Sequence, residues 1–538
     1  MFLRCKTIKK DKKQYQYYQI VENKKIKGKV RQRLILSLGN IEQAKQIAKA
    51  ATRLIEDSEL INLNTEVSPQ WSKEYGLCFV YQKIFNSCGL ADIINNLTSQ
   101  HKKLGFNLQK TIFNLILNRL IQPASEHRIA KQWNKTVYPA FSQDIELQHL
   151  YRAVRLLHQH KEEIEQSLFG KTKDLFHQQI DLAFFDTTST YLNGTKSDEF
   201  AQFGYSKDKR PDHKQLIIGV LLGPDSIPIG CEILPGNTTD VNAMVKIIQT
   251  VKQRFLINKI ILVGDGGMNS KDNRELLITE NMEYILGTRM RSIKVVKEYL
   301  QKHYPLNFEH SIIREKKDNL QYKEISLDEK RYIIIYNPEE ARRQKQTRQD
   351  IITKLEIQLK VKGIKSLIKN KGQRKYVKIN NELSQVADID QDKVKKEEIF
   401  DGLFVCETNT KLQAKEIVIQ YKNLWQVEKA FRNLKDIIEM RPIYHQIDRM
   451  IKGHIFVSFL ALYLEMYLKK QLIDNDIITT DIDELLNEVR EIKAVKIQIK
   501  DKSAVIRTEL GENANQLFRA LSIRPPDRIL ERWKSEKK

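Results

Sequence analysis

The sequence has few cysteines and no long apolar run, and each lack argues against a class of protein. Only five of its 538 residues are cysteines, none in a Cys-x-x-Cys pair and none beside a histidine cluster. Zinc and disulfide frameworks are therefore not expected. A location in the reducing cytoplasm is expected instead. No apolar run follows the basic N-terminus, so no secretory signal is predicted. The most apolar stretch, Ile455 to Leu468, is short and contains Glu465, which is typical of a buried helix rather than a membrane span.

Acidic residues are outnumbered by basic ones. The chain has 91 Lys and Arg against 68 Asp and Glu, a formal net charge of +23, spread along its whole length. This surplus favours a polyanionic partner, most simply nucleic acid. The alternative is a lysine-rich protein whose charges are simply solvated. At this length two to four domains are expected, and no internal repeat is visible.

Residues 1–65 are predicted to form a basic N-terminal module. Tyr15–Val21 and Val30–Leu38 have the composition of two strands, joined by a Lys-rich turn at Gly28, and a helix is expected after Asn40. The module is either a small DNA-contacting appendage or a solvated hairpin that packs on the main body.

Residues 66–178 are predicted to be helical. Apolar residues recur at helical spacing in 110–120 and again in 147–169. Basic residues are scattered among them, at Arg119, Arg128, Lys131, Arg152 and Arg155. The region either reads DNA ends or is a helical bundle packed in front of the core.

Residues 179–290 indicate the first part of an α/β core with a mixed sheet. The apolar runs Leu182–Phe185 and Lys259–Gly264 predict strands covered on both faces, and they end at Asp186 and Asp265. The segments between and after them predict a hairpin over 216–233, a helix over 241–255 capped by Thr239 or Asp240, a helix from Ser270 and a strand at 284–286.

The remainder divides into three parts. Residues 291–405 are predicted to be an α+β insertion domain, because a structureless segment of this length would be anomalous. Residues 406–470 complete the core and contain a buried helix from Gly453. Residues 471–538 are a C-terminal region with helices and a hairpin around Lys493–Arg507.

A helix is predicted around Tyr421–Lys435, with a capping box at Thr410 and Gln413. Its apolar stripe is interrupted by Lys435 and, above all, by Glu428. The stripe consists of Ile417, Tyr421, Leu424, Phe431 and Ile438. A carboxylate on an inward face is costly unless it is paired or binds a metal.

Asp186, Asp265 and Glu428 together suggest a metal centre. Sites in open α/β sheets lie at the carboxyl ends of strands, and a helix packed across that edge would bring the glutamate to the two aspartates. Oxygen-only ligands suit Mg²⁺ or Mn²⁺, and two such ions catalyse phosphoryl displacement. The structural alternatives are turn or capping roles for the aspartates and an ion pair of Glu428 with Lys429 or Arg432.

Several ordered motifs resemble DDE insertion-sequence transposases, in the IS-four superfamily with a Tyr-x2-Arg-x3-Glu-x6-Lys helix. They are Phe184–Tyr191, Gly204–Gln215, Pro235–Asp240, Val263–Ser270, Tyr421–Lys435, Arg441–His445 and Gly453–Phe456. The resemblance is close over residues 180–290 and 400–470 and looser in the flanks.

The resemblance implies an RNase H-like core in which Asp186, Asp265 and Glu428 bind the metal ions. It implies that Tyr421 and Lys435 hold the DNA end. Arg432, Lys207 and Arg210 are further DNA-binding candidates. Leu424 stands where the helix motif has an arginine, and no catalytic role is assigned to His213, which is expected to be exposed at the start of a strand.

These observations predict a bacterial DNA transposase. It would bind the terminal inverted repeats of its own element, as a homodimer, and would cut and join DNA with Mg²⁺ or Mn²⁺. A nucleoid-associated cytoplasmic location and no membrane partner are expected. The alternatives are a metal-dependent nuclease that does not join strands and an inactive DNA-binding derivative of a transposase.

Overall fold

The structure is a computed structural model that divides into two compact units. One unit comprises Met1–Ser72, Ala494–Thr508 and Asp527–Lys538, and the other comprises Lys73–Lys493 and Glu509–Pro526. All residues are described except 11–12, 27–28, 58–66, 102, 177–181, 193–199, 205–209, 224–225, 239, 256–260, 315–317, 363–374, 380–386, 425–429, 431, 433–442, 479–481, 500–501 and 536–538.

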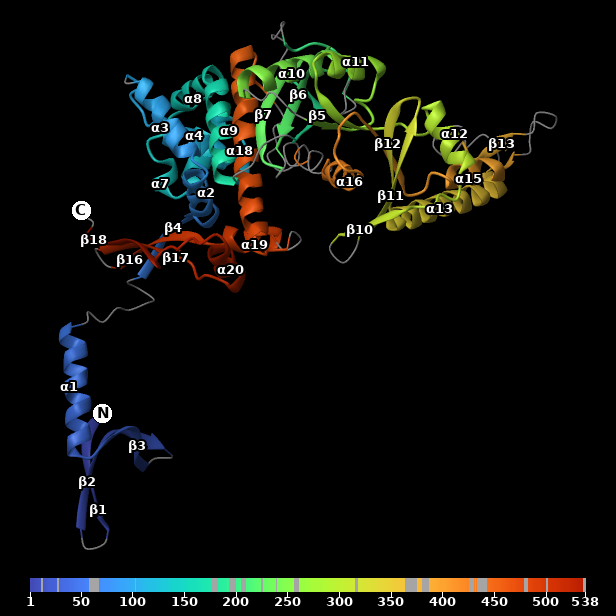
Figure 1. The fold of residues 1–538 in the computed structure, drawn as a ribbon. Helices are drawn as coiled ribbons and strands as arrows, with labels where there is room; N and C mark the ends of the chain where they lie inside the picture. The colour runs from blue at the N-terminus through green and yellow to red at the C-terminus, as the bar shows by residue number, and fades with distance from the viewer. Residues whose placement is uncertain are drawn as a thin grey trace. The chain divides into compact units, whose positions relative to one another are not determined.

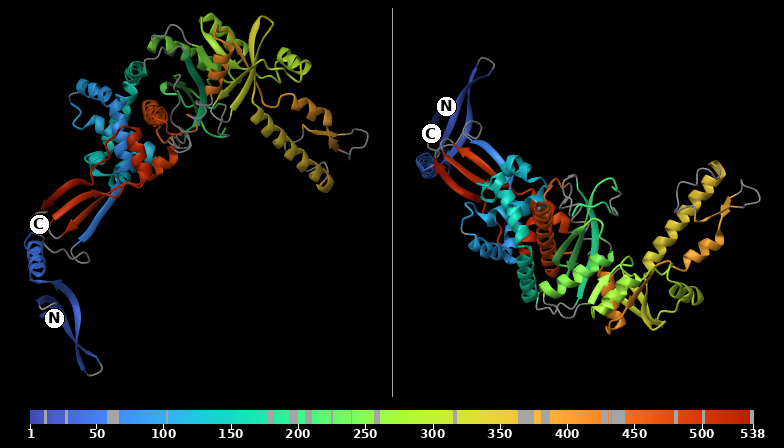
Figure 2. Two further views of the ribbon diagram at one scale, coloured as in Figure 1. Left: turned by 60° about the horizontal axis from the view of Figure 1, so that its bottom comes forward. Right: turned by 90° about the horizontal axis from the view of Figure 1, so that it is seen from above.

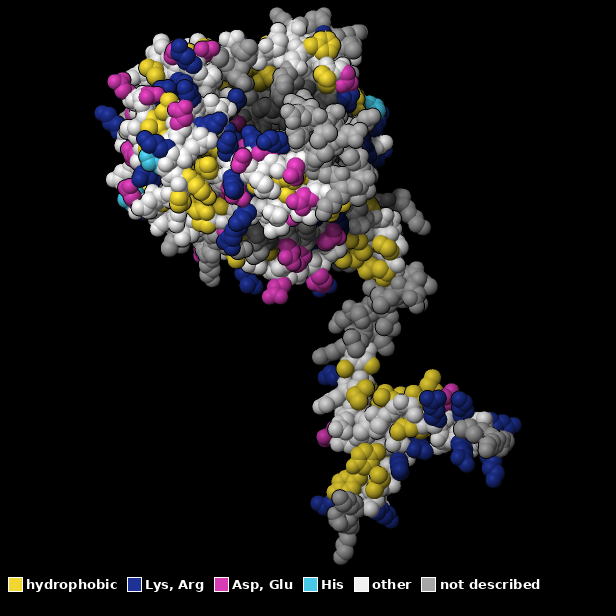
Figure 3. Space-filling view, turned by 90° about the vertical axis from the view of Figure 1, so that its right-hand side faces the viewer, with side chains coloured by type: hydrophobic (Ala, Val, Ile, Leu, Met, Phe, Trp, Pro, Cys, Tyr) yellow, Lys and Arg dark blue, Asp and Glu magenta, His cyan; other side chains and the backbone are white. Residues whose placement is uncertain are grey.

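The N-terminal module is an antiparallel sheet followed by a helix. Strands β1 (Phe2–Lys10), β2 (Lys13–Ile26) and β3 (Lys29–Gly39) pair in chain order, and α1 (Ile41–Asp57) follows. The predicted strands and helix are present, while β1 was missed because four of its nine residues are Lys or Arg. Val21 is the only buried hydrophobic side chain described in this module. Figure 3 shows Lys and Arg side chains along its sheet with hydrophobic side chains between them.

A four-stranded sheet is built from both ends of the chain. Its order is β18 (Ile529–Ser535), β17 (Lys502–Arg507), β16 (Lys493–Ile499) and β4 (Val67–Glu74). Strands β16 and β17 are the hairpin predicted around Lys493–Arg507. Strand β4 is an exception to the helical prediction for residues 66–178.

Helices dominate residues 75–176, as predicted. The longer ones are α2 (Gly76–Ser87), α3 (Leu90–Gln100), α4 (Leu108–Ile121), α8 (Leu147–Gln159) and α9 (Lys161–Phe176). Shorter turns lie between α4 and α8: α5 (Glu126–Arg128), the π-helical η1 (Ile129–Trp133), α6 (Asn134–Thr136) and α7 (Pro139–Ser142). The helical spacing predicted over 147–169 falls on two helices, α8 and α9, divided at His160.

The predicted buried helix is α18 (Asp448–Asp474). It is long and apolar enough to cross a membrane by length and composition alone, but 89% of its most apolar window is buried inside the protein. It packs against α4 and α8 on one side and β7 on the other, as Figure 1 shows. Its apolar surface is therefore used as the core between the helical region and the main sheet.

The main sheet is mixed, as predicted, and has nine strands within the described residues. In spatial order they are β10 (His310–Arg314), β11 (Asp318–Leu327), β12 (Lys330–Tyr336), β15 (Leu403–Thr408), β9 (Glu283–Gly287), β8 (Ile261–Gly264), β5 (Leu182–Tyr191), β6 (Gln215–Leu222) and β7 (Pro228–Pro235). Strands β5, β8 and β9 are parallel to one another, and the other neighbouring pairs are antiparallel.

Helices cover both faces of this sheet. Helices α10 (Asp240–Phe255) and α11 (Lys271–Thr279) share a hydrophobic core with Tyr284 and Leu286 of β9. Successive residues of a strand point to opposite faces, so Gly287 belongs to the other face. There α16 (Ala414–Asn423) packs over β8, β9, β11 and β12. Helix α16 thus covers β8 and β9 on the face to which Gly287 belongs.

Residues 291–405 contain both helices and strands. Strands β10, β11, β12 and β15 continue the main sheet, and α12 (Lys294–Lys302) packs on them. Helix α13 (Pro338–Lys362) projects away from the sheet and packs with α15 (Gln391–Glu398) and the hairpin of β13 (Val377–Ile379) and β14 (Ala387–Ile389) (Figure 2). That this segment is an insertion in a catalytic core remains a prediction. Beyond α18 lie α19 (Ile482–Arg490) and α20 (Glu512–Ala520).

Candidate active site

Asp186 lies within β5, and Asp265 directly follows the last residue of the neighbouring parallel strand β8. Strand β5 pairs with β8 through Leu182–Ile261, Ala183–Leu262 and Phe184–Val263. Each aspartate stands two residues beyond the pair of Phe184 and Val263. Neighbouring strands are about 4.8 Å apart, so the two residues are brought together although 78 positions separate them.

The prediction that β5 ends at Asp186 was wrong. The strand continues to Tyr191 and pairs with β6, where Asp186 lies opposite Val220. The reason is that Thr187–Thr190 are buried, and threonine side chains suit a covered strand. Asp186 is therefore two residues beyond the pairing with β8 but within the pairing with β6.

Asp265 is exposed at the start of a tight turn. Its Oδ1 atom accepts hydrogen bonds from the backbone N–H groups of Gly267 at 2.9 Å and Met268 at 3.2 Å. The turn is fastened to the end of β9, because Asn269 Nδ2 donates to the Gly287 carbonyl at 2.9 Å. Ser270 then caps α11 by accepting from Asn273 N–H at 3.1 Å. The turn role expected as the structural alternative is real, and it holds the carboxylate in one place.

The capping box predicted at Thr410 and Gln413 was wrong by one turn. Helix α16 has Gln413 as its N-cap and Glu416 as the reciprocal partner. The Thr410 carbonyl oxygen instead accepts a hydrogen bond from Arg331 Nη1 at 2.8 Å. The same nitrogen donates to the Leu412 carbonyl, also at 2.8 Å.

The inward face of α16 is as predicted as far as the helix is described. Ile417 and Leu424 are buried and Tyr421 is half-buried. A β-carbon on Gly287 would lie 2.5 Å from the Tyr421 hydroxyl and 2.8 Å from the Gly266 nitrogen. Only glycine leaves room at this position, and Tyr421 therefore lies beside the turn that carries Asp265.

The other predicted site residues are only partly described. Arg432 is an exposed helical residue, while Glu428, Lys435 and Lys207 lie outside the described residues. Arg210 is exposed, donates from Nε and Nη2 to Asp212 at 3.0 and 2.9 Å, and lies over the Tyr191 ring. His213 is half-buried rather than exposed, with Nδ1 3.2 Å from the Leu192 carbonyl.

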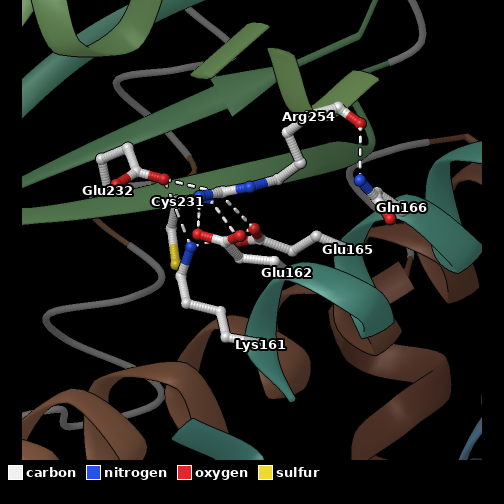
Figure 4. Close-up of polar contacts among 7 residues, drawn as sticks. All are labelled: Lys161, Glu162, Glu165, Gln166, Cys231, Glu232 and Arg254. Atoms are coloured by element: carbon white, nitrogen blue, oxygen red, sulfur yellow. Dashed lines mark hydrogen bonds and ion pairs between the residues drawn. The ribbon is translucent and has the colours of Figure 1, made fainter. Parts of the chain in front are cut away.

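A buried ionic cluster fastens the helical region to the sheet (Figure 4). Glu165 of α9 is fully buried and accepts from Lys161 Nζ at 2.9 Å and Arg254 Nη1 at 2.6 Å, and Arg254 also pairs with Glu232 of β7 at 2.6 Å. Burial raises the pKa of Glu165 even against its cationic neighbours. Burial acts to lower the pKa of Lys161, but Glu165, Cys231 and Glu232 together outweigh it and raise that pKa overall. These partners account for the cluster as a structural clamp.

A second group of ligand-type side chains escaped the sequence analysis. Glu126, His445 and His454 bring one carboxylate oxygen and two imidazole nitrogens within 4.8 Å of one another. The glutamate lies 319 positions from the nearer histidine. The sequence offered one indication of this group, the two histidines nine positions apart directly after the predicted Glu428 helix. Nothing in the sequence indicated that Glu126 would be their partner.

Comparison with known families identifies the class of protein. A model of the transposase DDE domain matches residues 177–464, more than half of the chain. The chain therefore belongs to the DDE transposases, enzymes of the polynucleotidyl transferase type. A model of the N-terminal domain of IS1634 family transposases matches residues 3–61. This second match agrees with an insertion-sequence transposase and covers the N-terminal module.

Comparison with individual proteins adds little. No curated protein matches the chain. Two solved structures are similar: the Mos1 transposase paired-end complex with left transposon end, and the Mos1 mariner paired-end complex with Mn. They are 11% and 12% identical, each match covers 37% of this chain and 71% of the other, and the TM-scores are 0.15 and 0.14. At such scores the likeness carries no argument.

Proposed function

We propose that this transposase cuts DNA at the ends of its own insertion sequence and joins the resulting 3′ ends to target DNA. The observation that supports the proposal is the parallel pairing of β5 with β8, because Asp186 and Asp265 each follow its last pair, Phe184 with Val263, by two residues. The order β7-β6-β5-β8-β9, with its antiparallel first three strands and parallel last three, supports an RNase H-like core. Membership of the IS-four subgroup is part of the same proposal.

The carboxylates fit the divalent metal ions that the family implies. Asp265 is exposed at the sheet edge, Asp186 is its neighbour, and oxygen-only donors suit Mg²⁺ or Mn²⁺. Glu428 is proposed as the third ligand and two ions as the full complement. When bound, such ions activate an attacking oxygen and stabilise the leaving oxygen of a phosphodiester.

The chain's own residues position the acidic group and the DNA. The hydrogen bonds from Gly267 and Met268 keep Asp265 at the edge, and Tyr421 lies beside it. Tyr421 is proposed to hold the DNA end, with contributions from Lys435, Arg432, Lys207 and Arg210. The net charge of +23 supports a polyanionic substrate.

Leu424 makes a different contribution from the arginine expected at its position. It is 8% exposed and follows the last turn of α16, where it packs inward. An arginine at this position would have to bury its guanidinium or turn toward the DNA. In this chain the DNA contact is therefore assigned to other residues of the segment. A homodimer that holds both ends and a cytoplasmic, nucleoid-associated location complete the proposal.

A strand-cleavage assay on a terminal DNA fragment tests the mechanism. Asp186→Asn and Glu428→Gln are each expected to abolish Mg²⁺-dependent cleavage, and the wild type is expected to yield strand-transfer products. Glu416→Gln is the matched control, since Glu416 is exposed on α16 and glutamine can keep its capping bond. Retained cleavage in Glu428→Gln would refute the proposed triad. Cleavage by the wild type without joining would identify a nuclease instead.

A further inference from the structure

We propose that Glu126, His445 and His454 form a binding site for one divalent transition-metal ion of the zinc class, separate from the carboxylate site. We call these three residues the Glu126 cluster. The Oε1 atom of Glu126 lies 3.1 Å from His445 Nε2 and 3.5 Å from His454 Nδ1. Ligand atoms about 2.1 Å from a tetrahedral zinc are about 3.4 Å apart. Both separations from Glu126 are close to that spacing, and all three ligand atoms lie within 4.8 Å of one another.

The chemistry of the donors selects the metal. One carboxylate and two imidazoles are a typical zinc ligand set, whereas Mg²⁺ prefers oxygen ligands alone. Glu126 and His454 are each 4% exposed. A charged carboxylate and neutral imidazoles are the forms that bind metal.

An open side gives the ion a way in. A cavity of about 300 Å³ adjoins the Glu126 cluster and is lined by all three of its residues together with Arg119, Ser125, Tyr151 and Tyr444, among others. Three protein ligands leave a fourth position of a tetrahedral zinc for water, and the cavity has room for it. The site is thus neither sealed nor fully solvated.

Arg119 is the competitor that decides between two interpretations. Its Nη2 atom lies 3.5 Å from His454 Nδ1, and the residue is 5% exposed. Without metal, the Arg119 guanidinium faces His454 and the cluster is a hydrogen-bonded network. With metal, the His454 lone pair turns to the ion and the guanidinium moves toward the cavity that it already lines. Removal of Arg119 is therefore expected to strengthen metal binding.

The ion would fasten three parts of the fold together. Glu126 belongs to α5 in the helical region, and His454 to the first turns of α18. His445 lies two residues beyond Ile443, which is buried and forms a parallel bridge with Leu192 at the end of β5. The metal would thus fix the segment that follows the predicted Glu428 helix against the strand that carries Asp186. Its role is positioning, not catalysis.

Zinc binding to the chelator-treated full-length protein tests the proposal. Excess Mg²⁺ is present throughout, so that the carboxylate site is occupied. We expect one Zn²⁺ per chain by elemental analysis and calorimetry, and a tetrahedral visible spectrum with Co²⁺. His445→Asn and His454→Asn are each expected to weaken binding by about 100-fold or more. Arg119→Gln is expected to bind zinc more tightly.

Two controls separate this site from others. His303→Asn alters a histidine that lies outside the cluster and is expected to bind zinc like the wild type. Asp265→Asn is also expected to keep its zinc while losing cleavage, so failure of the proposed function leaves this inference intact. His445 is only half-buried, so its variant is expected to fold, and circular dichroism is the measurement that checks this. The wild type taking up no zinc, or His445→Asn taking up as much as the wild type, would overturn the proposal.

Discussion

The turn at Asp265 and the Glu126 cluster are two acidic sites built in opposite ways. Asp265 is exposed, its neighbours are backbone N–H groups, and its companion Asp186 comes from the adjacent strand. Glu126 is buried, its neighbours are imidazoles, and its companions come from the far end of the sequence. The first arrangement suits hard cations that keep water, and the second suits zinc-class ions in a fixed position.

The contrast teaches that burial, as much as ligand type, distinguishes a site where metal ions and substrate exchange from a site that holds one ion permanently. An exposed carboxylate can meet a hydrated ion and a phosphodiester together. A buried glutamate must be compensated at all times, by His445, His454 or a metal ion. The Asp265 turn is therefore proposed as the reactive site and the Glu126 cluster as a fastening.

The largest expected effect comes from Asp265→Asn. Loss of a ligand charge at a metal-assisted displacement removes several kcal/mol of transition-state stabilisation, which corresponds to about a 1,000-fold loss of cleavage rate. Asparagine can still accept the bonds from Gly267 and Met268, so the turn should survive. Cleavage rates in Mg²⁺ and melting temperature are the measurements. If Asp265→Asn cleaved DNA at the wild-type rate, the Asp265 turn would not be the reactive site.

Gly287→Ala tests whether the reactive site is crowded. The new methyl group would meet the Tyr421 hydroxyl at 2.5 Å and the Gly266 nitrogen at 2.8 Å. Overpacking of this kind costs about 1–3 kcal/mol, and displacement of the Asp265 turn should slow cleavage by about 100-fold. Chemical denaturation and cleavage assays measure the two effects. Gly170→Ala is a control because a β-carbon there meets nothing within 4 Å and its φ is not positive.

The pH dependence of stability should report the Glu126 cluster. Burial, aided by Arg119, lowers the pKa of His454. The unfolded chain therefore binds more protons than the native one below about pH 6.5, and stability must fall as the pH drops through that range. The decrease in melting temperature between pH 7 and pH 5 should be smaller in His454→Asn. Parallel curves for the two proteins would show that His454 does not titrate as described.

Ser270→Ala is expected to have the smallest effect. The serine caps α11 immediately after the Asp265 turn, and loss of such a cap costs about 1 kcal/mol. Cleavage should slow only a few-fold, because Asp265 keeps its own hydrogen bonds. Ser270→Asp keeps a capping oxygen and should restore stability in urea unfolding. Equal losses in both variants would mean that Ser270 acts through something other than the cap.

Much of the core could be predicted because its signals are local. The apolar runs of β5, β6 and β8, the turn between β6 and β7, and the cap at Ser270 depend on a few neighbouring residues. Errors arose where a distant residue intervened. Arg331 binds the Thr410 carbonyl, where a helix start was predicted, and pairing with β6 extends β5 beyond Asp186. Glu428 and Lys435 lie outside the described residues, so their roles remain predictions.

The sequence by itself determined that Asp186 and Asp265 each follow an apolar strand, and that the chain carries a large positive charge. Those properties depend on order and composition. Only the tertiary structure decided that the two aspartates come from neighbouring parallel strands, that Gly287 makes room for Tyr421, and that Glu126 meets two histidines. The reason is that register and packing join residues far apart in the chain, and no local pattern records which distant side chain will fill a given space.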